Sequence, residues 1–406
     1  MFDAVVRANL LVTPEGPCSL ENCRTKETRS AAVAISGGRI ERVDEWDRIK
    51  ALDAKVVLDY SDYLMTPGLV DAHTHLIYAG NRGRELKWKL EGLDYKEIAE
   101  RGGGIFSTTR STREADASAL LELARKRCAS SMASGVTTLE VKTGYGLTYQ
   151  DEVKLLYVLS VLKSSLRARL IRSVLAAHAM PPEFPGGREG YINSVVMKLS
   201  EYAAKTGLAE FVDVFCEPGY FSISETRNIL SHASNLGLGL KVHADEFVRS
   251  GGAGLAAELG ATSADHLGKA SRSDLELMAR KGVTAVLLPM LFHYAMLDPP
   301  NLEKYRGIGL RVALASDFNP NSPNDSMLVT MNHACYNMRM LPDEALCGAT
   351  TNAASALGLH DVGAIRTGWR ADLAVFDVDD QNDLITRCGR SPLVFSMCEG
   401  LPILRE

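Results

Sequence analysis

The sequence contains eight cysteines but no CxxC pair. They are scattered along the chain at positions 18, 23, 128, 216, 335, 347, 388 and 398. In a chain of 406 residues this pattern indicates neither a zinc knuckle nor a disulfide framework. We therefore expect most of these cysteines to be reduced thiols that pack as small apolar groups.

Excess positive charge and long apolar runs are also absent. The net charge is −5, and no apolar run approaches the roughly 18 residues of a membrane span. Nucleic acid and membrane are therefore disfavoured as partners. An acid, Asp3, stands where a secretory signal carries positive charge, so a cytoplasmic protein is expected. The share of hydrophobic residues, 46%, is typical of a globular chain and argues against disorder.

From residue 69 onward, short apolar runs alternate with amphipathic stretches, which is the pattern of repeated βα units. The predicted strands are residues 69–75, 136–142, 170–178, 211–217, 238–243, 261–266, 283–289 and 311–317. Helices are predicted between them, among others at 119–134, 151–162, 222–236 and 272–281. These eight units predict an α/β fold of the (β/α)₈ TIM-barrel type, for which about 250 residues suffice.

Both ends of the chain have strand-like rather than helical patterns. Neither end alone has enough strands to bury a core, so we predict one small β-sandwich built from residues 1–65 and 362–406. The barrel would then span residues 66–361. Residues 77–118 form a long insertion after the first barrel strand and contain three consecutive glycines at 102–104. A loop of this length beside a barrel mouth is expected to cover the substrate.

Reactive side chains follow the predicted strands at their carboxyl ends, where barrel enzymes carry their active sites. Five of the nine histidines lie there, although core packing alone would scatter them. The residues at these positions are His73, His75, Lys142, His178, Glu217, His243, His266 and Asp317. Their convergence predicts a single functional site at one end of the barrel.

Two histidines separated by one residue predict a metal site within this set. On a strand, His73 and His75 would share a face and point together into the barrel. His243 and Asp317 would complete a set of nitrogen and oxygen ligands suited to zinc or iron, with one position left for water. A chance pair on an exposed strand is the alternative, which the two distant partners disfavour.

Glu246 and His266 are the candidates for handling protons near such a metal. Glu246 would take a proton from the water, and the alternative is a carboxylate that stabilises a helix N-terminus. Asp245 is a weaker candidate, because alternation would place it with His243. His266 would hold the attacking hydroxide or polarise the scissile carbonyl, and its alternative is a core histidine.

Lys142 and Glu217 receive no role from the sequence. In related barrels a carboxylated lysine bridges two metal ions, but such a lysine is expected on the fourth strand, where this chain has Glu217. A single metal ion is therefore the simpler reading.

Several sequence blocks carry a family resemblance. Residues 67–75 (PGLVDAHTH) resemble the opening strand of the amidohydrolase superfamily. Longer blocks resemble the imidazolonepropionase family: 101–105 (RGGGI), 140–147 (EVKTGYGL), 177–179 (AHA), 241–246 (KVHADE), 263–267 (SADHL) and 317–320 (DFNP). The resemblance spans nearly the whole chain, and the 140–147 and 241–246 blocks are more specific to that family than the histidine pair.

The resemblance implies metal-dependent hydrolysis of 4-imidazolone-5-propanoate to N-formimidoyl-L-glutamate, in histidine degradation. It implies that His73, His75, His243 and Asp317 bind one zinc or iron ion, and that Glu246 and His266 are catalytic. It implies substrate contacts from Arg82, Tyr95, Tyr145, His178, Asn319 and Ser322, with Arg82 binding the propionate carboxylate. A homodimer is expected from the resemblance alone.

The chain departs from the family pattern at two places. Met290–Tyr294, after the seventh strand, replace the usual small residues, and Asn321 stands where glycine is usual before Ser322.

Two rival functions remain open. A deaminase of heterocycles would share the metal site but would have no carboxylate for Arg82 to bind. A non-catalytic barrel would be marked by missing metal ligands, and none is missing from the sequence.

Overall fold

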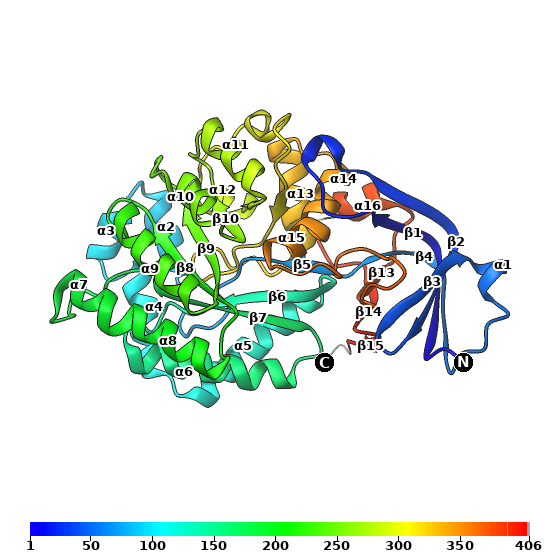
Figure 1. Ribbon diagram of the computed structural model, residues 1–406, viewed down its shortest axis with the longest axis horizontal. Coiled ribbons are helices and arrows are strands. Elements are labelled where there is room, and N and C mark those ends of the chain that lie inside the picture. The colour runs from blue at the N-terminus through cyan, green and yellow to red at the C-terminus, as the bar shows by residue number, and fades with distance from the viewer. Residues whose placement is uncertain (94, 388, 404–406) are drawn as a thin grey trace.

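The structure is a computed structural model that describes residues 1–93, 95–387 and 389–403, and for Tyr95, Lys96 and Ala99 only the backbone. Its larger part is a barrel of eight parallel strands paired in chain order (Figure 1). The strands are β5 (Leu69–Asp71), β6 (Val136–Lys142), β7 (Arg169–Ala177), β8 (Phe211–Cys216), β9 (Gly239–Ala244), β10 (Ser263–His266), β11 (Thr284–Leu287) and β12 (Val312–Leu314). Most of their residues are buried and apolar, as expected for parallel strands covered on both faces.

Helices surround the barrel and connect its strands. They are α5 (Ala117–Met132), α6 (Tyr149–Ser165), α7 (Gly187–Tyr191), α8 (Lys198–Thr206), α9 (Ile223–Asn235), α10 (Gly252–Leu259), α11 (Arg272–Lys281), α12 (Pro289–Ala295), α13 (Met327–Met338), α14 (Pro342–Gly348) and α15 (Thr351–Ala356). Local sequence sets several ends. Ser222 and Glu225 form a reciprocal capping box at the start of α9, and Gly282, at φ 73°, ends α11.

The chain termini together form a second sheet beside the barrel (Figure 1). Its strand order is β15–β14–β13–β4–β1–β2–β3. The elements are β1 (Ala4–Pro14), β2 (Thr25–Ser36), β3 (Arg39–Glu45), α1 (Trp46–Ile49), β4 (Val57–Pro67), β13 (Leu373–Phe376), α16 (Gln381–Thr386), β14 (Leu393–Cys398) and β15 (Leu401–Pro402). Arg39 in β3 also bridges to Arg370, just before β13, so the sheet curls around its own apolar core.

The predicted barrel and the β-rich module built from both termini are confirmed. The module consists of one curled sheet rather than two separate layers. The domain boundaries at residues 65/66 and 361/362 stay predictions. None of the helices in the described ranges combines the length and hydrophobicity needed to cross a membrane.

The first barrel strand is shorter than predicted, because it ends at Asp71 instead of His75. Beyond Asp71 the backbone turns to the segment after β12. The amide of His75 donates to the carbonyl of Phe318 at 2.8 Å, and the amide of Asp317 donates to the carbonyl of His73 at 3.2 Å. The two ends of the strand series therefore meet at the carboxyl side of the barrel.

The insertion at residues 77–118 is helical, whereas a loop was predicted. It contains α2 (Glu85–Leu90), α3 (Tyr95–Glu100) and α4 (Gly104–Glu114). Buried Glu85 organises it, since its carboxylate accepts a hydrogen bond from the amide of Gly104 at 2.9 Å. The insertion lies next to the barrel mouth, because Arg82 and Ile105 line the cavity there.

Candidate active site

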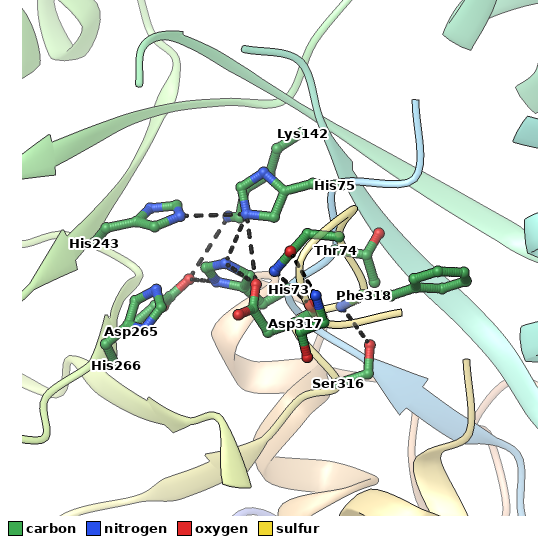
Figure 2. A network of polar contacts seen from close by, with 12 residues as sticks. His73, Thr74, His75, Lys142, His243, Asp265, His266, Ser316, Asp317 and Phe318 are labelled. Atoms are coloured by element: carbon green, nitrogen blue, oxygen red, sulfur yellow. Dashed lines mark hydrogen bonds and ion pairs between the residues drawn. The ribbon is translucent and has the colours of Figure 1, made fainter. Parts of the chain in front are cut away.

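The four predicted metal ligands meet at the carboxyl end of the barrel (Figure 2). The Nε2 atom of His75 lies 3.2 Å from Nε2 of His73 and 3.4 Å from Nε2 of His243. Oδ1 of Asp317 lies 3.7 Å from Nε2 of both His73 and His75. All four side chains are buried.

These separations fit a single metal ion. Two ligands at about 2.0–2.1 Å from a tetrahedral zinc lie about 3.3 Å apart. Burial lowers the pKa of His73 and His75 well below the usual histidine range, which favours the neutral imidazole that binds metals. Burial raises the pKa of Asp317 to about 7, as expected for a carboxylate that has lost water. The donor set therefore fits a divalent ion.

Two carboxylates contact the Nδ1 atoms of predicted ligand histidines, on the side of the ring opposite the converging Nε2 atoms. Nδ1 of His73 lies 2.7 Å from Asp265, and Nδ1 of His243 lies 3.0 Å from Asp213. Such partners fix the tautomer and ring orientation of a metal-binding imidazole. Sequence reasoning missed both aspartates, although an acid on an otherwise apolar buried strand was a usable signal.

Lys142 lies in a buried ionic network next to the predicted metal ligands. Its Nζ is 2.7 Å from Asp213 and 2.8 Å from Glu140, and Lys241 is 3.2 Å from Glu140. Although burial alone would lower the pKa of Lys142, the surrounding carboxylates raise it above the ordinary lysine value. Lys142 is therefore held as an ammonium, which is not the form that reacts to give a carboxylated lysine.

Backbone strain is concentrated at the same end of the barrel. Asp245, His266 and Asp317 all have positive φ angles, of 53°, 76° and 51°. Residues other than glycine hold this conformation only where their surroundings enforce it. For Asp317 the enforcing contacts come from Asp71, whose carboxylate accepts hydrogen bonds from the amide and hydroxyl of neighbouring Ser316 at 3.0 and 2.5 Å.

Glu246 and His266 face each other beside the predicted metal ligands. Oε2 of Glu246 lies 3.5 Å from Nδ1 of His266, and both residues line the cavity. Burial, followed by the charges of Asp317 and Glu217, raises the pKa of Glu246 well above its usual range. Burial lowers the pKa of His266 well below that of a free histidine. The arrangement suits a pair that exchanges a proton.

Two neighbouring acids position Glu246. The carboxylate of Glu217 accepts hydrogen bonds from the amides of Glu246 and Phe247 at 2.5 and 3.2 Å. Asp245 accepts from the amides of Gly251 and Ala253 at 2.8 and 2.9 Å, at the start of α10. Because backbone amides occupy the Asp245 carboxylate and Oε1 of Glu217, and Glu246 lines the cavity whereas these two acids do not, Glu246 is the better candidate base.

Arg82 lies at another side of the same cavity, which is lined by His75, Arg82, Ile105, Tyr145, His178, Phe215, Tyr220, His243, Glu246, Phe247, His266, Leu291, Asp317, Asn319 and Asn321. It is the only arginine or lysine among these lining residues. Its Nε and Nη2 donate to the carboxylate of Glu85 at 2.9 and 2.7 Å, and its side chain is 8% exposed. Arg82 is therefore a positioned guanidinium rather than a surface cation.

The other predicted substrate residues are distributed unevenly. Tyr145, His178 and Asn319 line the cavity, but Ser322 does not. Nδ1 of His178 lies 3.1 Å from the carbonyl of Gly144, and burial lowers the pKa of His178 to about 3, so its ring is neutral. The Asn319 side chain donates to the Asp317 carbonyl at 2.8 Å. The side chain of Tyr95 lies outside the described part of the chain.

Both departures from the family pattern lie near this cavity. Asn321 lines it, and its side-chain oxygen accepts a hydrogen bond from Lys89 of α2 at 2.5 Å. This contact connects the helical insertion to the loop after β12. The residues after β11 form α12, which contributes Leu291 to the lining. Sequence reasoning missed the apolar lining residues Phe215, Tyr220 and Phe247, because their spacing resembles ordinary core packing.

Comparison with known proteins agrees with this geometry. A sequence model of the amidohydrolase family matches residues 64–403. An imidazolonepropionase of Paracoccus denitrificans is 44% identical over 89% of this chain and 91% of its own length. An imidazolonepropionase of Geobacillus thermodenitrificans is 45% identical over 82% of this chain and 78% of its own.

Solved structures share the fold at low sequence identity. A zinc-bound adenosine deaminase of Xanthomonas campestris matches with a TM-score of 0.71 at 17% identity, over 100% of this chain and 94% of its own. A zinc-bound atrazine chlorohydrolase of Arthrobacter aurescens matches with a TM-score of 0.74 at 16% identity, over 98% of this chain and 94% of its own. Fold and site together define a hydrolase built on a metal-binding barrel. The chain belongs to the amidohydrolase family and, within it, to the imidazolonepropionases.

Proposed function

We propose that this chain hydrolyses 4-imidazolone-5-propanoate to N-formimidoyl-L-glutamate, a step of histidine degradation. One observation carries the proposal: a buried guanidinium, Arg82, shares a single cavity with the metal ligands and with Glu246. The substrate has the matching two ends, a propionate carboxylate and a cyclic amide. The relatives that share 44% and 45% of their aligned residues are named for this reaction.

The proposed chemistry divides between the metal and the side chains around it. A bound divalent ion would polarise the ring carbonyl and lower the pKa of water from about 15.7 toward about 7. Glu246 accepts the proton of the attacking water and delivers it to the ring nitrogen as the carbon–nitrogen bond breaks. His266 donates a hydrogen bond to the developing oxyanion. The water oxygen ends in the new carboxylate of the product.

In this proposal the substrate is oriented by cavity residues other than the metal ligands and the proton-handling pair. Arg82 binds the propionate through its planar fork while Glu85 holds the guanidinium in place. Tyr145, His178 and Asn319 contact the ring or its carboxylate, and Tyr95 and Ser322 belong to the proposed set on the strength of the family resemblance. Apolar Phe215 lines the cavity near them.

The test combines metal analysis with a substrate panel. We expect about one catalytic metal ion per chain and turnover of freshly generated imidazolone propionate. Adenosine, guanine, cytosine and hydantoin should not react, because none offers a carboxylate to Arg82. Turnover of one of these compounds, with none of imidazolone propionate, would replace the proposal with a deaminase or another cyclic amidase.

Replacing Arg82 with methionine should lower kcat/KM for imidazolone propionate by about 100-fold, mainly through KM, because a doubly hydrogen-bonded charge pair is lost. The measurement is steady-state kinetics on the substrate and on its methyl ester. The ester should be hydrolysed equally by both proteins.

Arg227, an exposed residue of α9 paired with Glu258, provides the matched control. Arg227→Met should behave like the unmodified protein. An Arg82→Met protein that discriminates acid from ester as well as the parent does would remove Arg82 from substrate recognition.

The proposal also specifies the setting of the enzyme. The metal is zinc or iron, since imidazole and carboxylate ligands accept both. A cytoplasmic location is part of the proposal as an expectation from the sequence. The homodimer rests on the family resemblance.

A further inference from the structure

Three cysteines meet at the amino-terminal side of the barrel, away from the catalytic end. Cys18 and Cys23 lie in the connector between β1 and β2, and Cys347 lies in α14. Their sulfur atoms all lie within 4.8 Å of one another, and the Cys18 and Cys23 sulfurs are 2.8 Å apart. We refer to these three residues as the thiol cluster.

The backbone around the thiol cluster is held in place. Asn352 of α15 accepts a hydrogen bond from the amide of Cys18 and donates one to its carbonyl, both at 2.9 Å. The next residue, Ser19, bridges to Arg311 immediately before β12. The connector is therefore fastened to the base of the barrel independently of its sulfur atoms, so the cluster is preorganised.

The three sulfurs differ in exposure. Cys23 and Cys347 are buried, and Cys18 is partly exposed. A metal ion can therefore reach the cluster at Cys18, and it would bind the sulfurs as thiolates after they lose their protons.

The geometry points to a second metal site: we infer that Cys18, Cys23 and Cys347 together bind a thiophilic d¹⁰ cation, either zinc or copper(I). Thiolates select these ions over harder ones. The nearby acid Glu344 is unavailable as a ligand, because Arg306 donates to both of its oxygens. A surface cavity of about 430 Å³ borders Cys23, and water from it can occupy a fourth position on zinc.

A disulfide explains the cluster less well. The Cys18 and Cys23 sulfurs are 2.8 Å apart, which is longer than the about 2.05 Å of a disulfide bond and shorter than the about 3.8 Å between two thiolates on one zinc ion, so metal binding would move them apart. A disulfide would also leave the third sulfur, Cys347, without a function. In a reducing compartment, clustered thiols more often bind metal than form structural disulfides. A metal ion here would tie the β1–β2 connector to α14 and so join the terminal sheet to the barrel.

Cobalt(II) distinguishes this site from the catalytic one. The ligands at the catalytic end are nitrogen and oxygen atoms, so cobalt there gives no sulfur-to-cobalt charge-transfer absorption. Reduced full-length protein titrated with Co²⁺ under anaerobic conditions should develop that absorption up to one equivalent per chain. Zn²⁺ or Cu⁺ should abolish it, and the midpoint of thermal unfolding should rise with Zn²⁺.

Variants assign the absorption to the cluster. Cys18→Ser, at a partly exposed position, should weaken cobalt binding at least tenfold, and Cys18→Ser/Cys347→Ser should abolish the absorption. Cys335→Ser on α13 alters a cysteine outside the cluster and should leave the absorption unchanged. Hydrolytic activity should persist in all three variants.

Either of two results would overturn the inference. One is the absence of charge-transfer absorption in the reduced parent protein. The other is a Cys18–Cys23 disulfide found by mass spectrometry in protein kept with reductant, which would make the cluster a covalent bridge instead.

Discussion

Glu246→Gln will bind its metal normally but will lose turnover by about 10²–10⁴-fold, because glutamine cannot accept or deliver the proton that we propose Glu246 transfers. The substitution keeps the shape of the side chain, and Glu217 still holds the backbone amide at position 246. KM should change little, since in the proposed mechanism Glu246 acts on the water rather than on the propionate. Steady-state kinetics together with metal content measures both effects.

Glu276→Gln is a suitable control for this experiment. Glu276 is an exposed acid of α11 paired with Arg272, so its replacement should leave kcat unchanged. Near-normal turnover by Glu246→Gln would remove Glu246 from the mechanism and transfer the role of base to another group. Loss of metal from Glu246→Gln would mean that the carboxylate supports the ion itself.

Removing the catalytic metal should lower kcat by at least about 10³-fold, because a bound cation contributes several kcal/mol to stabilising the transition state. One equivalent of zinc or ferrous iron per chain should restore activity. The metal-free protein should also unfold at a lower temperature, since an ion that binds only the folded state stabilises it. Chelation followed by stepwise reloading measures all three quantities.

The thiol cluster could also bind added metal, so the reloading experiment is repeated with the Cys18→Ser protein. In Cys18→Ser, reactivation should still require one equivalent, because the catalytic ligands are intact. Full activity in protein shown by elemental analysis to be metal-free would contradict a metal-dependent mechanism. If added metal restores activity to the parent protein but not to Cys18→Ser, the catalytic centre depends on the thiol cluster.

The architecture and the ligand set followed from local sequence signals. Buried parallel strands are continuous apolar runs, and each is short enough to be bounded by turn residues. The reactive residues follow these runs directly, so His73, His75, His243 and Asp317 could be expected at one end of the barrel from the order of elements alone. The bounds of α11 agree as well, because Ser271 and Gly282 mark its ends in the sequence.

The errors in the predicted elements have two causes. One segment pairs with residues far away in the chain, and two helices are very short. Whether residues 72–75 continue a strand depends on the segment after β12, with which Thr74 and His75 pair. Helices α2 and α3 have six residues each, too few for apolar periodicity to stand out from a loop.

Contacts between distant residues were likewise beyond the sequence. Asp213 acts on His243 from the neighbouring strand β8, whereas Asp265 of β10 reaches His73 after β5 across the barrel, and both contacts require the arrangement of the strands to be known. Cys347 joins Cys18 and Cys23 only because α14 packs near the β1–β2 connector. The spacing of these cysteines along the chain does not predict that they meet.

The curled terminal sheet has a consequence for biosynthesis. Strand β4 lies between β1, made at the start of translation, and β13, made after the entire barrel. A nascent chain can therefore pair β1, β2 and β4 early, but one side of β4 stays open while the ribosome completes the barrel. Until Leu373–Phe376 emerges, that exposed strand edge is available for wrong partners, so folding of the sheet ends last although it begins first.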